Sequence, residues 1–379
     1  MNTLSQIPAF NFIQTDAELA RICALAAQQD VIALDTEFMR VSSFFPKLGL
    51  IQLFDGERIS LIDPLAINDF SPFADLLKNP NVIKVLHACS EDLTVFLQEF
   101  HCLPTPMIDT QIMAHFLLGE NACGLAKLVL RYFHLEIDKS ATRTNWLKRP
   151  LSDVQLRYAA GDVWYLLPLY QKMREELAQT PWQQAVIDDC NFMLNQPHAP
   201  NTNAENAYLD IPNAWKLNPL ELARLRILAK WRMETAIERN IALNFVTKAD
   251  SLWLLAKHNP HNTTEMLEIG VNETDIRVRG KKLLWLLAQT RKVSPSDFPK
   301  RLVHAPDLAQ FKQAMQVAQS ALTPLLLAGL PKELIASKRD LESLVKWHLG
   351  LTSPEKLPKI LQNWREPIGF ALLKKIRAL

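Results

Sequence analysis

Two acidic residues at the end of an early apolar run constrain the fold of this chain more than any other feature. The run VIALDTEFMR predicts a buried strand, and because side chains alternate along a strand, Asp35 and Glu37 point from the same face. A third acid, Asp92, follows in HACSEDL, and RYAAGDVWYLL adds Tyr158 and Asp162. The last two are four residues apart in a helical pattern, so they share one helix face. A fold that gathers these acids must also neutralise them.

Cations are the simplest means of holding four carboxylates together, because like charges otherwise repel each other. We therefore predict a site for two divalent ions with Asp35, Glu37, Asp92 and Asp162 as ligands. Magnesium prefers oxygen ligands, and manganese accepts them too. Two such ions can activate a water molecule and stabilise the leaving oxygen of a phosphoryl displacement. A tyrosine hydroxyl is protonated at neutral pH, so Tyr158 is expected to orient the attacking water.

Each pattern is common by itself, and the prediction depends on their order within one α/β block. Asp-x-Glu often ends a solvated strand. The segment SEDLTVFLQEF predicts a helix with Ser90 as N-cap, and Asp92 in its first turn would also suit the positive helix end. Two acids compete for the site: Glu91 would point elsewhere on its helix, and Asp109 suits the N-cap of the next helix. His87 is expected to be a core histidine.

The chain has 379 residues, enough for two or three domains. Alternating strand and helix patterns predict an α/β domain with a mixed sheet over residues 1–195, including an antiparallel meander of VIALDTEF, LGLIQLF and ISLID. A long helix from Ser152 to Gln179 is expected to bend at Pro168. Prolines and asparagines predict a linker over residues 196–213. Helical periodicity alone follows, over residues 214–293 and, after a second proline-bearing break, over residues 294–379.

The two helical blocks resemble each other faintly, which makes an internal duplication a hypothesis. Aligned at a constant offset, FVTKADSLWLL and LIASKRDLESL pair Phe245 with Leu334, Val246 with Ile335, Leu252 with Leu341 and Leu255 with Leu344.

Charge separates the two halves of the chain although the net charge is only +2. Residues 1–190 hold 15 Lys and Arg against 23 Asp and Glu, whereas residues 191–379 hold 27 against 17. A basic rear half is suited to polyanions, although two unrelated domains could also differ in this way. Within RVRGKKLLW, Gly280 at a helix start, with Arg277, Arg279 and Lys281 around it, could offer amides and charge to a phosphate. A solvated basic face is the alternative.

Targeting and redox features are those of an intracellular protein. We expect no signal peptide, since no basic start precedes an apolar core near the N-terminus. No apolar run approaches the length of about 18 residues that a bilayer requires, so no membrane partner is expected. The five cysteines are widely spaced without a Cys-x-x-Cys pair, which fits a reducing cytoplasm.

The motifs resemble a known family. DTEFMR followed by LGLIQL, then VLHACSEDL and YAAGDVWYLL, resembles the three exonuclease motifs of the DEDD superfamily in its tyrosine-bearing branch, and specifically ribonuclease D, over about residues 8–190. The segment from about Leu217 to Gln289 resembles the HRDC domain, a small helical nucleic-acid-binding module. By position, the block from about Leu302 is identified as the second, divergent copy.

This resemblance implies an α/β ribonuclease H-like exonuclease domain with a mixed sheet, followed by two small all-α HRDC-like domains. It also implies hydrolysis of RNA from the 3′ end to 5′-mononucleotides, with tRNA precursors as substrates. The metal-binding acids of the family fall on Asp35, Glu37, Asp92 and Asp162, and the water-positioning tyrosine falls on Tyr158. We expect a cytoplasmic monomer. Deleting residues from Asn213 onward is expected to leave the metal site intact and to weaken RNA binding.

Two other functions compete with this interpretation. A DNA 3′-5′ exonuclease could use the same acids, because RNA specificity depends on contacts to the 2′-hydroxyl that no motif reveals. A nucleic-acid-binding scaffold with an inactive nuclease domain is the second, but such proteins usually lose a metal-binding acid, and all four are present here.

Overall fold

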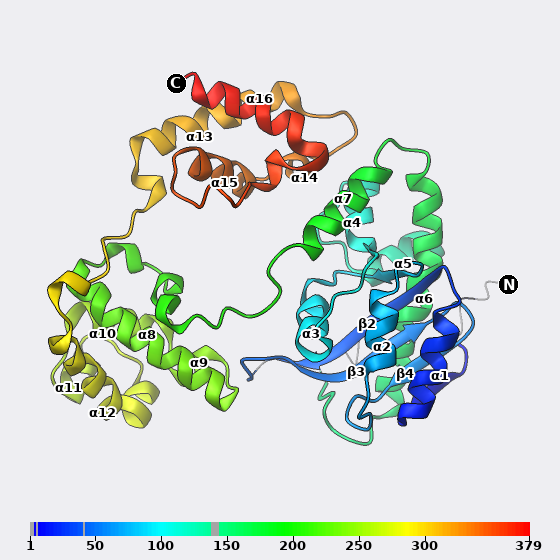
Figure 1. Ribbon diagram of the computed structural model, residues 1–379, viewed down its shortest axis with the longest axis horizontal. Coiled ribbons are helices and arrows are strands. Elements are labelled where there is room, and N and C mark those ends of the chain that lie inside the picture. Colours follow the sequence, from blue (N-terminus) through cyan, green and yellow to red (C-terminus); the bar gives the residue numbers. More distant parts are fainter. Residues whose placement is uncertain (1–3, 5–6, 41, 138–143) are drawn as a thin grey trace. The chain divides into compact units, whose positions relative to one another are not determined.

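The computed structural model describes all residues except 1–3, 5–6, 41 and 138–143 (Figure 1). Contacts divide the chain into two compact units, which are described separately. The first unit comprises residues 1–39, 47–199 and 305–379, and the second comprises residues 40–46 and 200–304. The last 75 or so residues therefore belong with the N-terminal part of the chain and not with the helical block that precedes them in sequence. Among the described residues, no helix combines the length and apolar character needed to cross a bilayer.

A six-stranded mixed sheet forms the centre of the first unit, as predicted. Its spatial order is β1-β4-β3-β2-β5-β6. The pairs β2/β3 and β3/β4 are antiparallel, which confirms the predicted meander, while β1/β4, β2/β5 and β5/β6 are parallel. The strands are β1 (Phe10–Ile13), β2 (Val31–Met39), β3 (Lys47–Phe54), β4 (Ile59–Ile62), β5 (Ile83–Leu86) and β6 (Met107–Asp109).

Strand β2 lies at the middle of the sheet, and its sequence explains both its burial and its end. Ile32, Ala33 and Leu34 are fully buried, as expected for a central strand covered on both faces. From Asp35 onward every residue of the strand except Thr36 is partly exposed. The pairing with β3 shifts by one residue between Glu37 and Phe38. Such bulges occur next to active sites because they redirect side chains.

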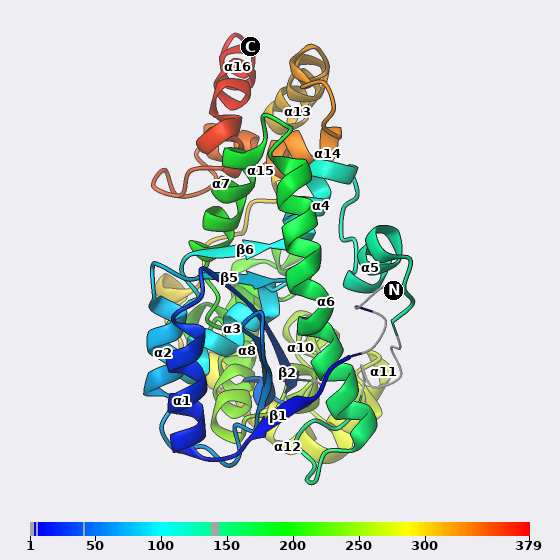
Figure 2. The same ribbon diagram turned by 90° about the vertical axis from the view of Figure 1, so that its right-hand side faces the viewer.

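Helices cover both faces of the sheet (Figure 2). Figure 2 shows α1 and α2 on one side and the long α6 on the other. Ser152 caps α6 through a capping box with Gln155, and the helix continues through Pro168 to Leu177. The helices are α1 (Asp16–Ala26), α2 (Ser71–Lys78), α3 (Ser90–Phe100), α4 (Thr110–Leu118), α5 (Leu125–Phe133), α6 (Asp153–Leu177) and α7 (Gln183–Leu194).

The predicted N-cap of α3 is wrong by one residue. Ser90 is the first helical residue, Cys89 takes the N-cap position, and no side chain caps this helix. Asp92 nevertheless lies in the first turn, as predicted.

The C-terminal helices complete the first unit. They are α13 (Ala309–Leu322), α14 (Lys332–Ile335), α15 (Lys338–His348) and α16 (Glu366–Arg377). Their apolar side chains are continuous with the core of the α/β part. Phe116 of α4 and Trp182 both lie against Trp364, with ring centroids 5.5 and 6.3 Å apart.

The second unit is all-helical and has its own core. It contains α8 (Pro219–Arg239), α9 (Leu243–Val246), α10 (Ala249–His258), α11 (Thr263–Glu268) and α12 (Glu273–Gln289). Residues 196–213 were predicted to be a linker, but the second half of this segment is folded. A 3-10 helix, Ala204–Asp210, packs on α8, and Ala207 and Ile211 are buried in this core. The loop between β2 and β3 also joins this unit, because Ser42 accepts a hydrogen bond from the Ala242 amide at 2.9 Å.

The proposed duplication gains structural support. Helices α9 and α10 begin at Leu243 and Ala249, and α14 and α15 begin at the equivalent positions Lys332 and Lys338. Three of the four aligned pairs are buried in both copies: Val246 and Ile335, Leu252 and Leu341, and Leu255 and Leu344. The fourth pair differs, because Phe245 is 59% exposed and Leu334 only 5%.

Candidate active site

The structure brings the five predicted active-site side chains together from three elements. Asp35 and Glu37 lie on β2, Asp92 lies in the first turn of α3, and Tyr158 and Asp162 lie one turn apart on α6. Electrostatic repulsion couples Glu37 to each of the other three carboxyl groups. Asp35 is coupled to Asp162, and Asp92 to Asp35. The four acids therefore form one electrostatic cluster.

Burial is the main reason why these carboxyl groups resist ionisation. It raises the pKa of Asp35 and of Asp92 well above the ordinary value, and repulsion from the neighbouring acids adds to the effect. Burial and the same repulsion raise the pKa of Glu37 to about 10. Burial raises the pKa of Asp162 to about 7, although a hydrogen bond with Tyr158 opposes the shift. Ionising all four groups at neutral pH requires added positive charge.

The donor atoms of this cluster fit divalent cations. All are carboxylate oxygens, which Mg²⁺ prefers, and the buried Oδ2 of Asp162 has no hydrogen-bond partner in the described part of the chain. Asp35, Glu37 and Asp162 are half-buried, so the cluster is open to ligands, whereas Asp92 is 7% exposed. Within the described ranges, no three acidic, histidine or cysteine side chains already converge as a finished metal site. The carboxylates would therefore have to rotate toward the ions.

Thr36 positions one of the acids, and sequence reasoning missed it. It lies between Asp35 and Glu37 on β2, points to the opposite face of the strand, and is 6% exposed. Its hydroxyl donates a short hydrogen bond to Oδ1 of Asp92. The Asp-Thr-Glu tripeptide therefore supplies two carboxylates and also holds a third.

Asp109 caps α4 as predicted, and it also holds the turn between β5 and α3, the helix that carries Asp92. Its Oδ1 accepts from the Gln111 amide at 2.7 Å, which confirms the cap of α4. The same carboxylate accepts from the amides of Ala88 and Cys89, both at 3.0 Å. Ala88 has a left-handed backbone with φ of 54°, so this β5–α3 turn is strained and depends on the fully buried Asp109.

Substituting Asp109 by alanine is expected to destabilise the first unit by about 2–4 kcal/mol, because three backbone amides lose a charged acceptor. Since the strained turn precedes α3, we also expect weaker activity in the variant fraction that remains folded. Urea unfolding checks the stability, and Glu91→Ala, which removes an exposed acid in the first turn of α3, is the control. Equal stability of the two variants would contradict the role of Asp109.

Arg149 anchors the segment before α6. Its guanidinium pairs with the buried Asp63 at 2.8 and 2.5 Å and donates to the Gly49 carbonyl at 2.8 Å. Trp146 in the same segment lies so close to Gly49 that an added Cβ would come within 2.8 Å of it. Trp146 also packs on Tyr158, with ring centroids 6.1 Å apart. These contacts fix the start of the helix that carries Tyr158 and Asp162.

His87 behaves as predicted. Its Nδ1 is 2.8 Å from the Thr110 hydroxyl, and burial lowers its pKa. It therefore remains neutral and packs at the end of β5.

Family models match three segments of the chain. Residues 10–178 match a 3′-5′ exonuclease domain, residues 221–287 match the HRDC domain, and residues 310–372 match the C-terminal HRDC domain of ribonuclease D. Ribonuclease D of Haemophilus influenzae is 56% identical over 98% of this chain and 93% of its own length. The chain belongs to the ribonuclease D family. Its activity is therefore that of a 3′-5′ exoribonuclease.

Solved structures agree with this assignment. The crystal structure of Escherichia coli ribonuclease D, described as an exoribonuclease involved in structured RNA processing, superposes with a TM-score of 0.91 at 39% identity, covering 98% of this chain and 99% of that one. The catalytic core of RRP6 from Trypanosoma brucei shares the fold, with a TM-score of 0.63 at 21% identity over 75% of this chain and 80% of that one. The ribonuclease H-like fold and the two HRDC domains implied by the sequence are confirmed, and the exonuclease fold supports dependence on divalent metal.

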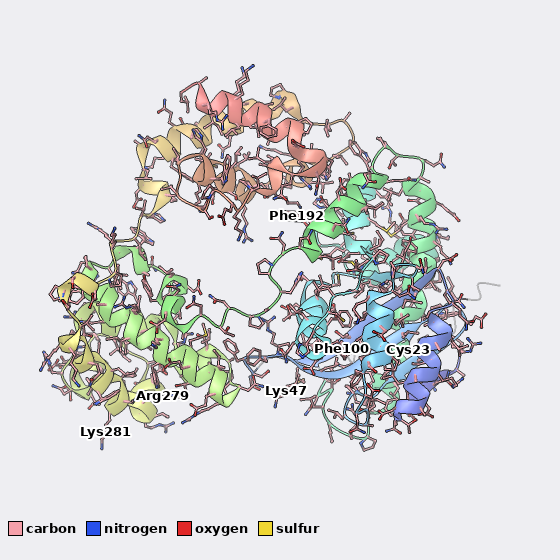
Figure 3. All side chains as sticks on the ribbon, in the orientation of Figure 1. Cys23, Lys47, Phe100, Phe192, Arg279 and Lys281 are labelled. Atoms are coloured by element: carbon pink, nitrogen blue, oxygen red, sulfur yellow. The ribbon has the colours of Figure 1, made fainter. Side chains whose placement is uncertain are left out.

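The sequence suggested that Gly280 in RVRGKKLLW begins a helix and offers its amides to a phosphate, and this prediction is wrong. Gly280 does not begin a helix: it is buried in the middle of α12, where its amide belongs to the helix ladder. Arg279 donates to the Phe245 carbonyl at 2.9 Å, which ties α12 to the end of α9. Figure 3 labels Arg279 and Lys281 on this helix. Arg277 and Lys281 are exposed.

Magnesium is expected to stabilise this protein more at pH 8 than at pH 6. Acids whose folded-state pKa is raised contribute stability below about pH 4, which is lost as the pH rises through the folded-state values, about 7 for Asp162 and about 10 for Glu37. In EDTA the melting temperature should therefore fall between about pH 5 and pH 8. Cations that bind the ionised site should reverse this loss.

Thermal melts in EDTA and in saturating Mg²⁺, at both pH values, measure this linkage. Asp162→Asn is the informative variant, because it removes one titrating acid and should flatten the pH dependence in EDTA. If Mg²⁺ raised the melting temperature equally at both pH values, cation binding would not depend on ionisation of the carboxyl cluster.

Proposed function

We propose that this exoribonuclease uses two Mg²⁺ or Mn²⁺ ions, held by Asp35, Glu37, Asp92 and Asp162, to hydrolyse RNA from its 3′ end to 5′-mononucleotides. The observation that carries the proposal is the cluster of four coupled carboxyl groups whose pKa values burial raises. Bound ions would supply the activation of water and the neutralisation of phosphate charge.

Tyr158 is proposed to orient the attacking water. Its hydroxyl hydrogen-bonds with Asp162, and its ring packs on Trp146. A side chain held at both its ends keeps one geometry, which favours a water held in line with the scissile phosphate. The half-buried position of Tyr158 leaves it within reach of substrate.

The exposed face of α12 is proposed to contact the RNA backbone. Arg277 and Lys281 keep the role predicted for them, while Arg279 is assigned instead to holding α9. The same face presents Lys282 and Trp285, and the Lys282 ammonium lies 4.0 Å from the centre of the indole ring, which is 53% exposed. Basic side chains interleaved with an exposed aromatic are typical of single-strand binding, since phosphates pair with the former and bases stack on the latter.

Precursors of tRNA with 3′ extensions are the proposed substrates, and a monomer in the cytoplasm is the proposed state. All five cysteines are free thiols and four are buried, which suits a reducing compartment.

The test is a time course on a tRNA that carries a short 3′ extension and a 5′ label, in Mg²⁺ and in EDTA. Stepwise shortening that stops near the mature end and requires metal is expected. A DNA strand of the extension sequence serves as the comparison. Faster digestion of the DNA would favour a DNA exonuclease, and tight binding without shortening would favour a scaffold.

A further inference from the structure

A cavity in the second unit lies outside every site described above. It has a volume of about 530 Å³, within the range of cavities that hold a small ligand. Its walls come from α8, from the loop between α10 and α11, and from the end of α12 with the segment that follows.

The charge of the cavity is positive. Arg224 and Arg291 contribute to its lining, and none of the lining residues that the structure describes is acidic. Arg224 donates to the Ala256 carbonyl at 3.2 Å, so its guanidinium is held in place before any ligand arrives. Fixed guanidinium groups favour phosphate, because their N–H groups match its oxygens in a planar fork.

Most of the remaining lining is apolar, apart from the polar residues Asn259, His261 and Thr290, and Thr290 points to a ligand. Leu284, Leu287 and Phe298 form much of the wall. Thr290 is 5% exposed, and its hydroxyl has no hydrogen-bond partner in the described part of the chain. A buried hydroxyl without a partner loses free energy, and a polar ligand in the cavity would restore the missing bond.

We propose that this cavity binds one nucleotide of a single-stranded RNA. The apolar wall receives the base, Arg224 and Arg291 bind the adjacent phosphate, and the Thr290 hydroxyl bonds with the base edge or the ribose. The cavity begins at Leu284 and Ala288, within one helical turn of Trp285 on the proposed RNA-binding face. A strand on that face would therefore reach it. This inference rests on the proposed RNA substrate.

Fluorescence anisotropy of the full-length protein with a labelled 12-nucleotide single-stranded RNA tests the proposal, in EDTA so that no digestion occurs. Arg291→Ala is expected to weaken binding about tenfold and to reduce the salt slope by about 0.7, the value for one lost phosphate contact on a single strand. Lys292→Ala is the matched control, because Lys292 is the exposed basic neighbour and does not line the cavity. Its effect should remain below about twofold.

Thr290→Val separates ligand binding from folding. The substitution keeps the shape of the side chain and removes a hydroxyl without a partner, so the melting temperature should stay the same or rise. RNA affinity should nevertheless fall about threefold. Arg224→Ala should weaken binding like Arg291→Ala. If loss of the hydrogen bond to Ala256 unfolds the Arg224→Ala variant, Arg291→Ala and Thr290→Val still test whether the cavity binds RNA.

Two results would overturn the proposal. Unchanged affinity of Arg291→Ala and Thr290→Val would leave the cavity without a role in RNA binding. Equal losses in Arg291→Ala and Lys292→Ala would show a diffuse basic field and no specific pocket. Digestion in Mg²⁺ is measured separately: absence of shortening by the unmodified protein would count against the exonuclease proposal and not against the cavity.

Discussion

Replacing Asp162 by asparagine is expected to lower the rate of 3′ shortening by about 100- to 1000-fold, the cost of losing one preorganised charged group in an active site. The substitution keeps the size of the side chain but removes a carboxylate that is coupled to Asp35 and Glu37 and bonded to Tyr158. One side chain thus contributes to ion binding and to the position of the tyrosine hydroxyl.

Stability and RNA affinity distinguish a loss of chemistry from a loss of structure. Without metal, Asp162→Asn should melt at the same or a higher temperature than the unmodified protein, because one member of a repelling cluster is gone. RNA affinity in EDTA should also be retained. Asp153→Asn provides the control on the same helix, since Asp153 is exposed in the first turn of α6. Full activity of Asp162→Asn would show that the carboxyl cluster is not the catalytic centre.

Removing Asp189 is expected to lower the free energy of unfolding of the first unit by about 3–5 kcal/mol, the usual cost of leaving one charge of a buried pair without its partner. Asp189 lies on α7 and Arg365 lies before α16; they are 5% and 2% exposed. The guanidinium donates to both carboxylate oxygens of Asp189, through Nη1 to Oδ1 and through Nη2 to Oδ2 at 2.8 Å. It also donates to the Leu334 carbonyl at 2.8 and 3.1 Å. Trp364 donates to Asp189 at 3.0 Å.

The ionisation of Asp189 follows from these contacts. Burial alone would raise its pKa, but the Arg365 guanidinium, helped by Lys359 and Trp364, more than offsets burial and holds the pKa below its ordinary value. This contribution to stability is therefore present at neutral pH and is lost as the pH falls below about 4.

Urea unfolding of Asp189→Ala, with Asp188→Ala as control, measures the contribution. Asp188 is the preceding residue on α7 and is only half-buried, so its substitution should cost less than about 1 kcal/mol. Combining Asp189→Ala with Arg365→Met should recover part of the loss, because the buried Arg365 guanidinium is no longer left without its partner. A cost for Asp189→Ala as small as that for Asp188→Ala would mean that the C-terminal helices are held mainly by apolar contacts.

The ion pair also changes the expected result of a truncation. The sequence suggested that deleting residues from Asn213 onward would leave the metal site intact. The structure adds a second expected effect, because the deletion also removes Arg365 and Trp364 and exposes the face of α4 and α7 on which α13–α16 pack. Removal of the second unit alone, with a short connection between residues 199 and 305, is the cleaner test of its part in RNA binding.

Local patterns in the sequence were enough to predict the catalytic elements. Alternation along VIALDTEF placed Asp35 and Glu37 on one face, and the spacing of four between Tyr158 and Asp162 placed both on one face of α6. These relations depend on backbone periodicity alone, which a single segment carries. The mixed sheet and the Asp109 cap followed for the same reason.

Contacts between distant residues could be found only in the tertiary structure. The bonds from Thr36 to Asp92, from Arg149 to Asp63 and from Arg365 to Asp189 join residues 56, 86 and 176 positions apart. In the sequence each of these side chains looks like an ordinary polar residue. Its hydrogen bonds contribute strongly only where they are buried, and burial arises only when the elements pack. Gly280 shows the opposite error: a glycine beside basic residues suggested a phosphate-binding turn, but Gly280 lies inside α12 and faces Thr263 and Met266. The sequence by itself thus determined the candidate metal-binding residues and the class of fold, whereas the tertiary structure alone decided what holds those residues in place and to which unit the C-terminal helices belong.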